Sequence, residues 1–386
     1  MKRSLFFLLC LCVLPVLSQE NRFRKTLGKL QAYLDSSAVR KVDTNYIEVP
    51  QKPWRIAIRE KSDEFNLSMK AELDEKFASE KGYIGVGNQD GDRFSWKMRF
   101  NPPIAQAIGF FAGYRGLGIG YSFNLRKKMG RTFSFSSSGT HYGLNFRYRR
   151  FSTNSVDVDA IIKENEKLDE IHSSGETPEP VRVRSIILDG YYLFNGKRFS
   201  QAAAYSQSVI QKRSAGSLML GAMFHHSSVD MAKDRNVMFI QLYDDIGKFS
   251  IQQIHLGVGY GYNWVPTRGL LVNAMAMPTI SVFSKVKTHK YDSNYSIFAE
   301  IKDDGHKPIP YDDPSWLDDV KIWKTGIDTK YGNVHFNIDA RASITYSWNR
   351  YFMNVFGQVN QFKYGFSISD VRLIDWYVRG SFGVRF

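Results

Sequence analysis

Apolar residues occupy every second position over long stretches of the chain, which is the period of a β-strand with two unlike faces. The clearest stretch is residues 334–348, where apolar side chains from Val334 to Trp348 alternate with polar ones from His335 to Ser347 without exception. A strand of a globular protein usually has about five to six residues, whereas a tilted strand that crosses a membrane needs about nine to eleven. The stretch therefore favours a membrane-spanning strand.

Similar two-faced segments follow one another from Ile104 to the C-terminus. Their polar faces contain mainly Gly, Ser, Asn and His with occasional Arg and Asp, which suits a confined, hydrated lumen, while the apolar faces suit lipid. Closing such a sheet satisfies the edge backbone groups that lipid cannot. We therefore predict an all-β protein: a transmembrane antiparallel β-barrel over residues 104–386, of about 12 strands, with 10 and 14 as alternatives.

The final strand ends the chain on Phe386, with apolar residues at even positions and mostly polar ones at odd positions. This ending resembles the C-terminal recognition strand of Gram-negative outer-membrane barrels. We predict that it is read by the barrel-assembly machinery and closes against a first barrel strand near residues 104–114. The apolar face that carries this predicted assembly signal includes Trp376, Val378, Phe382, Val384 and Phe386.

One change of phase interrupts the preceding strand. Apolar positions run from Met353 to Val359 with one parity and then from Phe362 to Phe366 with the other. A β-bulge near Asn360 and Gln361 would account for this change.

The chain before the predicted barrel has two parts. Residues 1–18 combine a basic start with an apolar core, which predicts a signal peptide and export to the cell outer membrane. Residues 19–103 are predicted to be a periplasmic segment or plug, with a basic amphipathic helix over 23–41 and short strands. Periplasmic strands, plug strands and first barrel strands remain open alternatives for residues 40–100.

Composition adds three constraints. Aromatic residues make up 15% of the chain, which suits aromatic girdles at membrane interfaces. Both cysteines lie within the first 18 residues, so the exported chain has no thiol chemistry. The formal net charge of +14 suits anionic partners. For an exported chain without a nucleic-acid motif, those partners are outer-membrane lipid and lipopolysaccharide.

The connections between predicted strands differ in length. Residues 212–214, 266–269 and 349–350 form tight turns, whereas 230–250 and 286–332 are long, so we predict the long loops outside and 286–332 as an outer cap. The long charged segment 151–180 breaks this rule, because it falls on the periplasmic side if residues 131–149 form two strands.

The predicted lumen is mildly basic. Asp339 with Arg341, and Asp375 with Arg379, are expected to form ion pairs that hold the wall. The sequence predicts no metal site and no cofactor, since the histidines have no ligand spacing. The expected lumen residues are Arg147, Arg149, Asp189, His255, Asn337, Asp339, Arg341, Asp375, Arg379 and Arg385.

A catalytic alternative depends on one pair of segments. Ser206 or Ser208 with His226 could form the Ser/His pair of an outer-membrane lipid hydrolase, if adjacent strands brought them together. There is no Gly-x-Ser-x-Gly elbow, and neighbouring histidines point to opposite faces of a strand. The sequence favours a protein that is not an enzyme.

Several short motifs carry a family resemblance. They are residues 43–48, Phe100-Asn-Pro102 leading into 109–118, Phe194-Asn195 with Phe199-Ser200, and residues 211–217. With these motifs the chain resembles an uncharacterised Bacteroidota outer-membrane barrel family catalogued as a domain of unknown function. The resemblance implies a barrel and no activity. We therefore predict a narrow pore or small-solute binding barrel, with a plugged structural or surface-recognition barrel and the lipid hydrolase as alternatives.

Overall fold

A computed structural model describes residues 28–29, 31–36, 42–73, 93–100, 105–124, 130–164, 167–232, 236–296, 299, 305–310, 313, 315–332, 334–366 and 369–386. The predicted signal peptide over residues 1–18 lies outside the described residues. Within the predicted helix over 23–41, residues 28–29 and 31–36 are described and helical.

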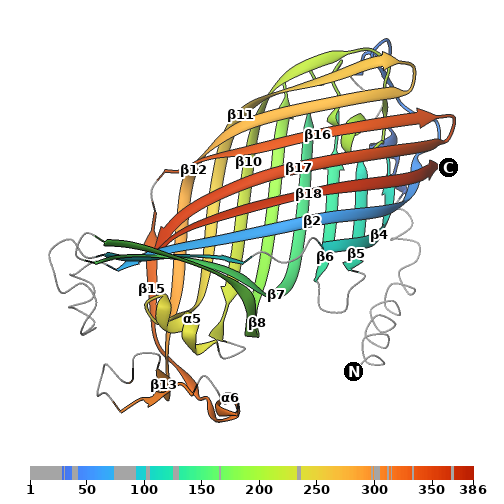
Figure 1. Ribbon diagram of the computed structural model, residues 1–386. Coiled ribbons are helices and arrows are strands. Elements are labelled where there is room, and N and C mark those ends of the chain that lie inside the picture. The colour runs from blue at the N-terminus through green and yellow to red at the C-terminus, as the bar shows by residue number, and fades with distance from the viewer. Residues whose placement is uncertain are drawn as a thin grey trace.

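Twelve antiparallel strands close into one barrel, in which each strand pairs with the strands before and after it (Figure 1). The ring closes where the last strand pairs with the first, and the prediction of an all-β barrel of about 12 strands is confirmed. Around the ring the strands are β2 (Trp54–Leu73), β4 (Ala105–Tyr114), β5 (Leu117–Asn124), β6 (Arg131–Ser138), β7 (Tyr142–Glu164), β8 (Lys167–Leu193), β10 (Ala215–Asp230), β11 (Ile246–Thr267), β12 (Leu270–Ser293), β16 (Phe336–Trp348), β17 (Tyr351–Phe366) and β18 (Ser369–Arg385).

The closing seam joins β18 to β2, so the barrel begins at Trp54 and not at residue 104, and the predicted closure against 104–114 is wrong. At the seam, Trp54 and Phe386 exchange two backbone hydrogen bonds of 3.0 and 3.1 Å. The sequence left this segment open between a periplasmic strand, a plug strand and a first barrel strand. In the structure, Arg55 and Arg59 of β2 point inward and are buried, and Ile56 and Ile58 are exposed on the outside.

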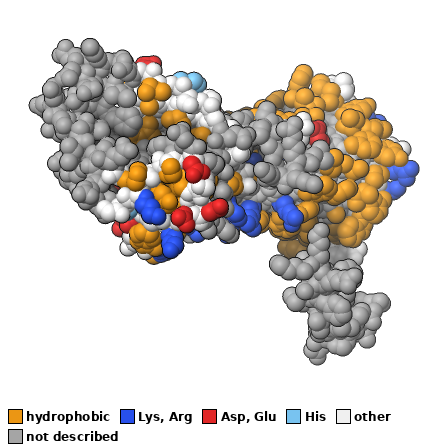
Figure 2. All heavy atoms as spheres, turned by 60° about the horizontal axis from the view of Figure 1, so that its bottom comes forward, with side chains coloured by type: hydrophobic (Ala, Val, Ile, Leu, Met, Phe, Trp, Pro, Cys, Tyr) orange, Lys and Arg blue, Asp and Glu red, His pale blue; other side chains and the backbone are white. Residues whose placement is uncertain are grey.

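We call the end of the barrel that carries Phe386 and the turns at 115–116, 268–269 and 349–350 the proximal end, and the opposite end the distal end. Over the proximal part, apolar side chains face outward in a continuous belt, which Figure 2 shows as hydrophobic side chains packed over the barrel wall. Such a belt is the surface that lipid covers. It includes Ile56, Ile58, Phe110, Ile119, Tyr121, Tyr142, Leu188, Tyr192, Leu218, Leu220, Leu256, Val258, Tyr260, Ile338, Ile344, Met353, Val355, Val378 and Phe382.

The two faces exchange polarity at the distal edge of this belt. On the outer face of β17, the exposed residues change from the apolar Met353 and Val359 to the basic Lys363. On the inner face at the same level, the apolar Phe362 is buried. The register between β17 and β18 runs from residue 351 to 366 without a shift, so the bulge predicted near Asn360 is absent from this pairing. The apolar residues therefore change from odd to even positions because the apolar belt ends at this level of the strand. A bulge does occur on β12, where the register with β11 shifts between Ser281 and Phe283.

The distal part extends well beyond the belt. β7 and β8 form a hairpin of 23- and 27-residue strands, so the segment 151–180 lies at the distal end although residues 131–149 do contribute two strands. β3 (Arg93–Phe100) bridges β2 and β7 past the short β5 and β6. The predicted outer loop 286–332 begins and ends in strand, because β12 continues to Ser293 and pairs there with β15 (Ile322–Tyr331).

Small elements complete the ends of the barrel. At the distal end these are α5 (Val237–Leu242), α6 (Trp316–Asp319), and the parallel pair β13 (Tyr295–Ser296) and β14 (Lys307–Pro308). At the proximal end, residues 194–214 contain α4 (Gln201–Tyr205) and β9 (Ile210–Gln211), which pairs with β1 (Ile47–Glu48). No helix within the described ranges is both long and apolar enough to span a membrane.

Candidate functional site: a filled lumen

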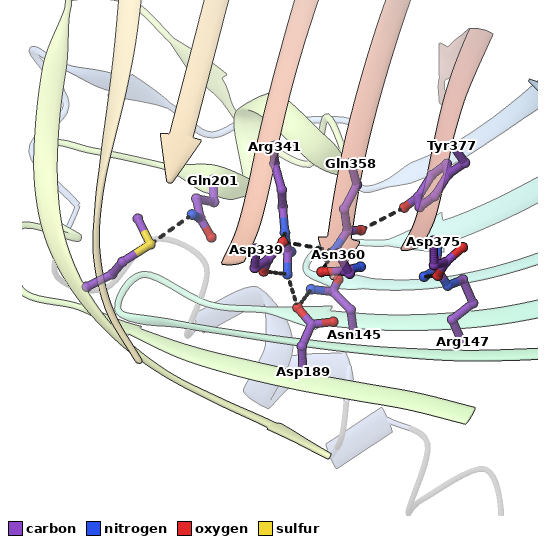
Figure 3. A network of polar contacts seen from close by, with 11 residues as sticks. Asn145, Arg147, Asp189, Gln201, Asp339, Arg341, Gln358, Asn360, Asp375 and Tyr377 are labelled. Atoms are coloured by element: carbon purple, nitrogen blue, oxygen red, sulfur yellow. Dashed lines mark hydrogen bonds and ion pairs between the residues drawn. The ribbon is translucent and has the colours of Figure 1, made fainter. Parts of the chain in front are cut away.

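The inside of the barrel at the level of the belt is polar, and its centre is a buried ion-pair network (Figure 3). Arg341 on β16 pairs with Asp339 on the same strand and reaches Asp189 on β8. All three side chains are at most 8% exposed. Because an unpaired charge in such a site costs several kcal/mol, the three groups stabilise one another in this arrangement.

A second pairing crosses the lumen from β7 to β18. Arg147 and Arg149 both donate hydrogen bonds to the carboxylate of Asp375. The sequence paired Asp375 with Arg379 instead, and that partner assignment is wrong. The four-residue spacing on one strand suggested it, but the actual partners are more than 200 positions away and meet only when the barrel closes.

Neutral side chains extend the Arg341 network toward the Asp375 pairing, where the Arg147 guanidinium lies 4.7 Å from the Tyr377 ring centre. Asn145 donates to Asp189 and Gln358 donates to Asp339, each over 3.1 Å, and the Tyr377 hydroxyl donates to Gln358 over 3.1 Å. Nearby, the side chains of His255 and Asn337 lie 3.0 Å apart. The structure thus places the predicted lumen residues on the inward face, and strands distant in sequence bring them together.

The proximal mouth is filled by residues 194–214, which we call the plug. Its helix α4 is buried inside the barrel against β12, β16 and β17. Wall side chains hold its carbonyl groups: Arg379 donates to Tyr205 over 3.1 Å, and Arg385 donates to Gln207 over 3.2 Å. Asn354 donates to the Ala204 carbonyl over 3.0 Å.

The sequence did not predict a plug over residues 194–214. The one available signal was the run Ala202–Ala204, whose small side chains allow a helix to approach a wall closely. Residues Asp43 to Glu48, which lie ahead of the barrel, brace the plug through β1 and an Arg198–Asp43 ion pair of 3.2 Å.

The distal part of the interior is filled by an apolar core. Side chains from β2, β3, β7, β8, β10, β11, β12, β17 and β18 meet there, together with Ile240 and Tyr243 from the connection that carries α5. The Tyr243 hydroxyl donates to the Met69 carbonyl over 3.1 Å. The core includes Met69, Trp96, Met98, Phe100, Phe151, Val181, Val183, Val229, Phe249, Ile251, Phe362, Tyr364, Val371 and Leu373.

The residues considered for catalysis do not come together. Ser206 and Ser208 are buried in the plug, with their hydroxyl oxygens 3.4 Å apart. His226 lies on the outward-facing positions of β10, and its Nδ1 is 3.0 Å from the Ile251 carbonyl. The barrel wall therefore separates the histidine from both serines. Among the described residues there is also no group of three or more His, Cys, Asp or Glu that could hold a metal ion.

A closed antiparallel ring with an apolar outside and a polar, filled inside defines an integral β-barrel of the outer-membrane type. Within that class, the chain belongs to the family described as Domain of unknown function (DUF4421), whose model matches residues 41–386. A search of curated proteins returns no match.

Solved structures similar to the chain include three barrels. The translocator domain of the autotransporter NalP from Neisseria meningitidis is 9% identical with a TM-score of 0.31, covering 96% of this chain and 98% of that chain. The COG4313 outer membrane channel from Pseudomonas putida F1 is 8% identical with a TM-score of 0.30, covering 88% and 97%. The Pseudomonas putida toluene transporter TodX is 7% identical with a TM-score of 0.28, covering 87% and 90%.

Proposed function

We propose that the protein is an outer-membrane barrel, closed at both ends, that anchors a packed distal body at the cell surface. The observation that carries this proposal is the apolar core inside the distal part of the barrel. A conducting lumen needs a continuous polar path, and side chains such as Phe100, Phe249 and Phe362 occupy that position. The plug supplies a second seal at the proximal end. The proposal thus takes up the plugged surface-recognition alternative.

The orientation follows from charge. Just beyond the apolar belt, basic side chains face outward in cross-strand rows: Arg150 lies opposite Arg184, and Lys363 lies opposite Arg372. Like charges directly opposite each other are unfavourable unless an anion lies over them. Lipopolysaccharide phosphates of the outer leaflet would supply that anion. We therefore place the distal end outside, the proximal end in the periplasm, and an export signal in residues 1–18.

This partner can be tested on the purified barrel in detergent. Lipopolysaccharide should raise the unfolding temperature of the natural chain, and it should have a smaller effect on the Arg150→Gln/Arg184→Gln variant. The matched control is Arg268→Gln, in the proximal turn. If lipopolysaccharide raised the unfolding temperature of all three proteins equally, the proposed lipopolysaccharide partner would be wrong. The proposal of a sealed barrel would not be affected.

Conductance in planar bilayers tests the sealed barrel. We expect no discrete steps from the natural chain. We also expect none from a variant in which a short turn replaces residues 196–212, because the distal core remains. Discrete steps from the natural chain would overturn the proposal.

A gated passage for small solutes is the second candidate. It is favoured by the polar layer around Arg341, which a purely structural wall does not require. In that case, removing the plug alone should produce discrete conductance steps. Adding Arg341→Ser to the variant without the plug should reduce the preference of this conductance for anions.

A further inference from the structure

The inner faces of β2 and β18 bring four arginines together at the closing seam. The register places Arg55 directly opposite Arg385, and Arg59 opposite Ser381, with Arg379 one inward position further along β18. Like charges opposite each other in a sheet are destabilising. The seam therefore concentrates positive charge where the barrel has to close.

Burial makes this arrangement more costly. Arg55, Arg59 and Arg385 are at most 6% exposed, and a buried charge without a counter-charge costs several kcal/mol. Their contacts are carbonyl groups, aromatic rings and one hydroxyl group. Arg55 donates to the Leu117 carbonyl over 3.3 Å, the Arg59 guanidinium lies 3.6 Å from the Phe111 ring centre, and Arg385 donates to the Ser347 hydroxyl over 3.2 Å. Among the residues that the structure describes, none of the four arginines pairs with a carboxylate. By contrast, Arg147, Arg149 and Arg341 all do.

Unused hydrogen-bond donors point to the same place. The Nε groups of Arg59 and Arg379 are buried without a hydrogen-bond partner among the described residues, and so is the Tyr205 hydroxyl of the plug. Buried polar groups are normally paired, so each such group requires an explanation. These three donors come from β2, β18 and the plug, and all three residues line one cavity.

The cavity has a volume of about 90 Å³ and lies between the plug and the wall. Arg59, Arg379 and Tyr205 line it together with Ser134, Ser136 and Ser206. Arg147, Arg341 and Asp189 also line it, and the Asp189 carboxylate is already paired with Arg341. We propose that this arginine cavity binds one small oxyanion of the phosphate or sulfate class. Guanidinium and hydroxyl donors match the several acceptor oxygens of such an ion, and its negative charge would offset Arg59 and Arg379, the two seam arginines that line the cavity.

The proposed anion would also connect the plug to the seam. Tyr205 contributes its hydroxyl to the cavity, while its carbonyl accepts from Arg379. An oxyanion in the cavity would therefore stabilise the docked plug together with the closed seam. Binding at this site does not depend on whether the barrel conducts.

Phosphate binding to the folded barrel in detergent tests the proposal. Inorganic phosphate, at an ionic strength matched with sodium chloride, should raise the unfolding temperature of the natural chain, since a ligand that binds only the folded state stabilises it. Equilibrium dialysis should give about one phosphate per barrel. Binding to Arg59→Gln and Arg379→Gln should be roughly tenfold weaker or more, because each change removes a charged donor. Sulfate in a parallel series distinguishes a general oxyanion site from a phosphate-selective one.

Two controls separate the site from a purely structural role. Arg268→Gln removes an exposed arginine from a proximal turn and should bind phosphate like the natural chain. In phosphate-free buffer, Arg59→Gln should unfold at the same or a higher temperature, because it relieves repulsion, whereas a structural arginine would lower that temperature. Heat-modifiable migration on gels shows which variants are folded. No phosphate-dependent rise in the natural chain, or equal binding by Arg59→Gln and the natural chain, would overturn the proposal.

Discussion

At the residue scale, the lumen is organised by charges that compensate one another. Arg341 satisfies two aspartates from different strands, and Asp375 satisfies two arginines. Removing one partner from such a set leaves a buried charge without a counter-charge, which is far more destabilising than removing the whole set.

Arg341→Met should therefore lower the free energy of unfolding by about 3–5 kcal/mol, since Asp189 and Asp339 both lose their counter-charge. Urea unfolding of the refolded barrel measures this loss. The triple variant Arg341→Met/Asp189→Asn/Asp339→Asn should recover most of the stability. A single variant as stable as the natural chain would show that the network contributes little.

A second residue-scale prediction concerns Asp35, on the helical segment beside the proximal mouth. The hydrogen bond from Arg115, 2.6 Å long, lowers the pKa of the Asp35 carboxyl below its ordinary range, and Tyr114 donates a further bond of 2.9 Å. A lowered carboxyl pKa gives a contact that is complete at neutral pH and is lost as the pH falls through the lowered value. The segment should therefore stay docked at and above the ordinary pKa of a carboxyl group, and it should detach at lower pH, as the pH falls through the lowered pKa of Asp35.

A fluorescent label at Tyr33→Cys, which is exposed on the same helical segment, reports this change. Asp35→Asn should show the detached signal at every pH. A pH response that is unchanged by Asp35→Asn would assign the transition to another group.

At the scale of elements, the plug is a wedge whose fit depends on small side chains. Ala203 and Ala204 are at most 1% exposed. Ala204→Trp should therefore expel α4 and release the Lys212 backbone from the Tyr46 carbonyl, so that trypsin cleaves several-fold faster at the already exposed residues 212–213. Ala222→Trp is the matched control, because Ala222 faces outward on β10. Equal cleavage of the two variants would contradict a tightly docked plug.

The closing seam is the second element with a direct test. Deleting Phe386 removes both backbone hydrogen bonds to Trp54 along with the aromatic end of the predicted assembly signal. The amount of protein inserted into the outer membrane should fall strongly. It should fall less for Phe386→Ala, because this variant keeps the backbone hydrogen bonds. Normal insertion of the shortened chain would count against the role of this strand in assembly.

These elements also show which features of the fold and of the lumen could be predicted from the sequence. Alternation is local, so the inward position of Asp339 and Arg341 followed directly from the segment 334–348. The partners of Asp375 depended on closure of the ring, and no local pattern encodes them. For β2 the sequence left three alternatives open, because the period of two at Ile56 and Ile58 fits a barrel strand and the charged residues between them also fit a periplasmic one.

At the scale of the whole molecule, the barrel has two zones joined by continuous strands. In the proximal zone apolar side chains face outward, and in the distal zone they face inward. The sequence alone suggested that every apolar face meets lipid, which is why Phe362 and Tyr364 were assigned to the outside. The exchange of faces marks the level at which the strands leave the membrane, and both the proposed sealed lumen and the proposed surface role depend on it.

A single-cysteine scan along β17 tests this exchange most directly, because both natural cysteines lie within residues 1–18. Spin labels at 353, 355 and 359 should be accessible to oxygen dissolved in lipid, whereas labels at 361 and 363 should be accessible to a water-soluble relaxation agent. Labels at 360, 362 and 364 should be protected from both. Oxygen accessibility at 362 and 364 would instead show that a bulge turns these side chains toward lipid. That result would contradict the exchange of faces along β17.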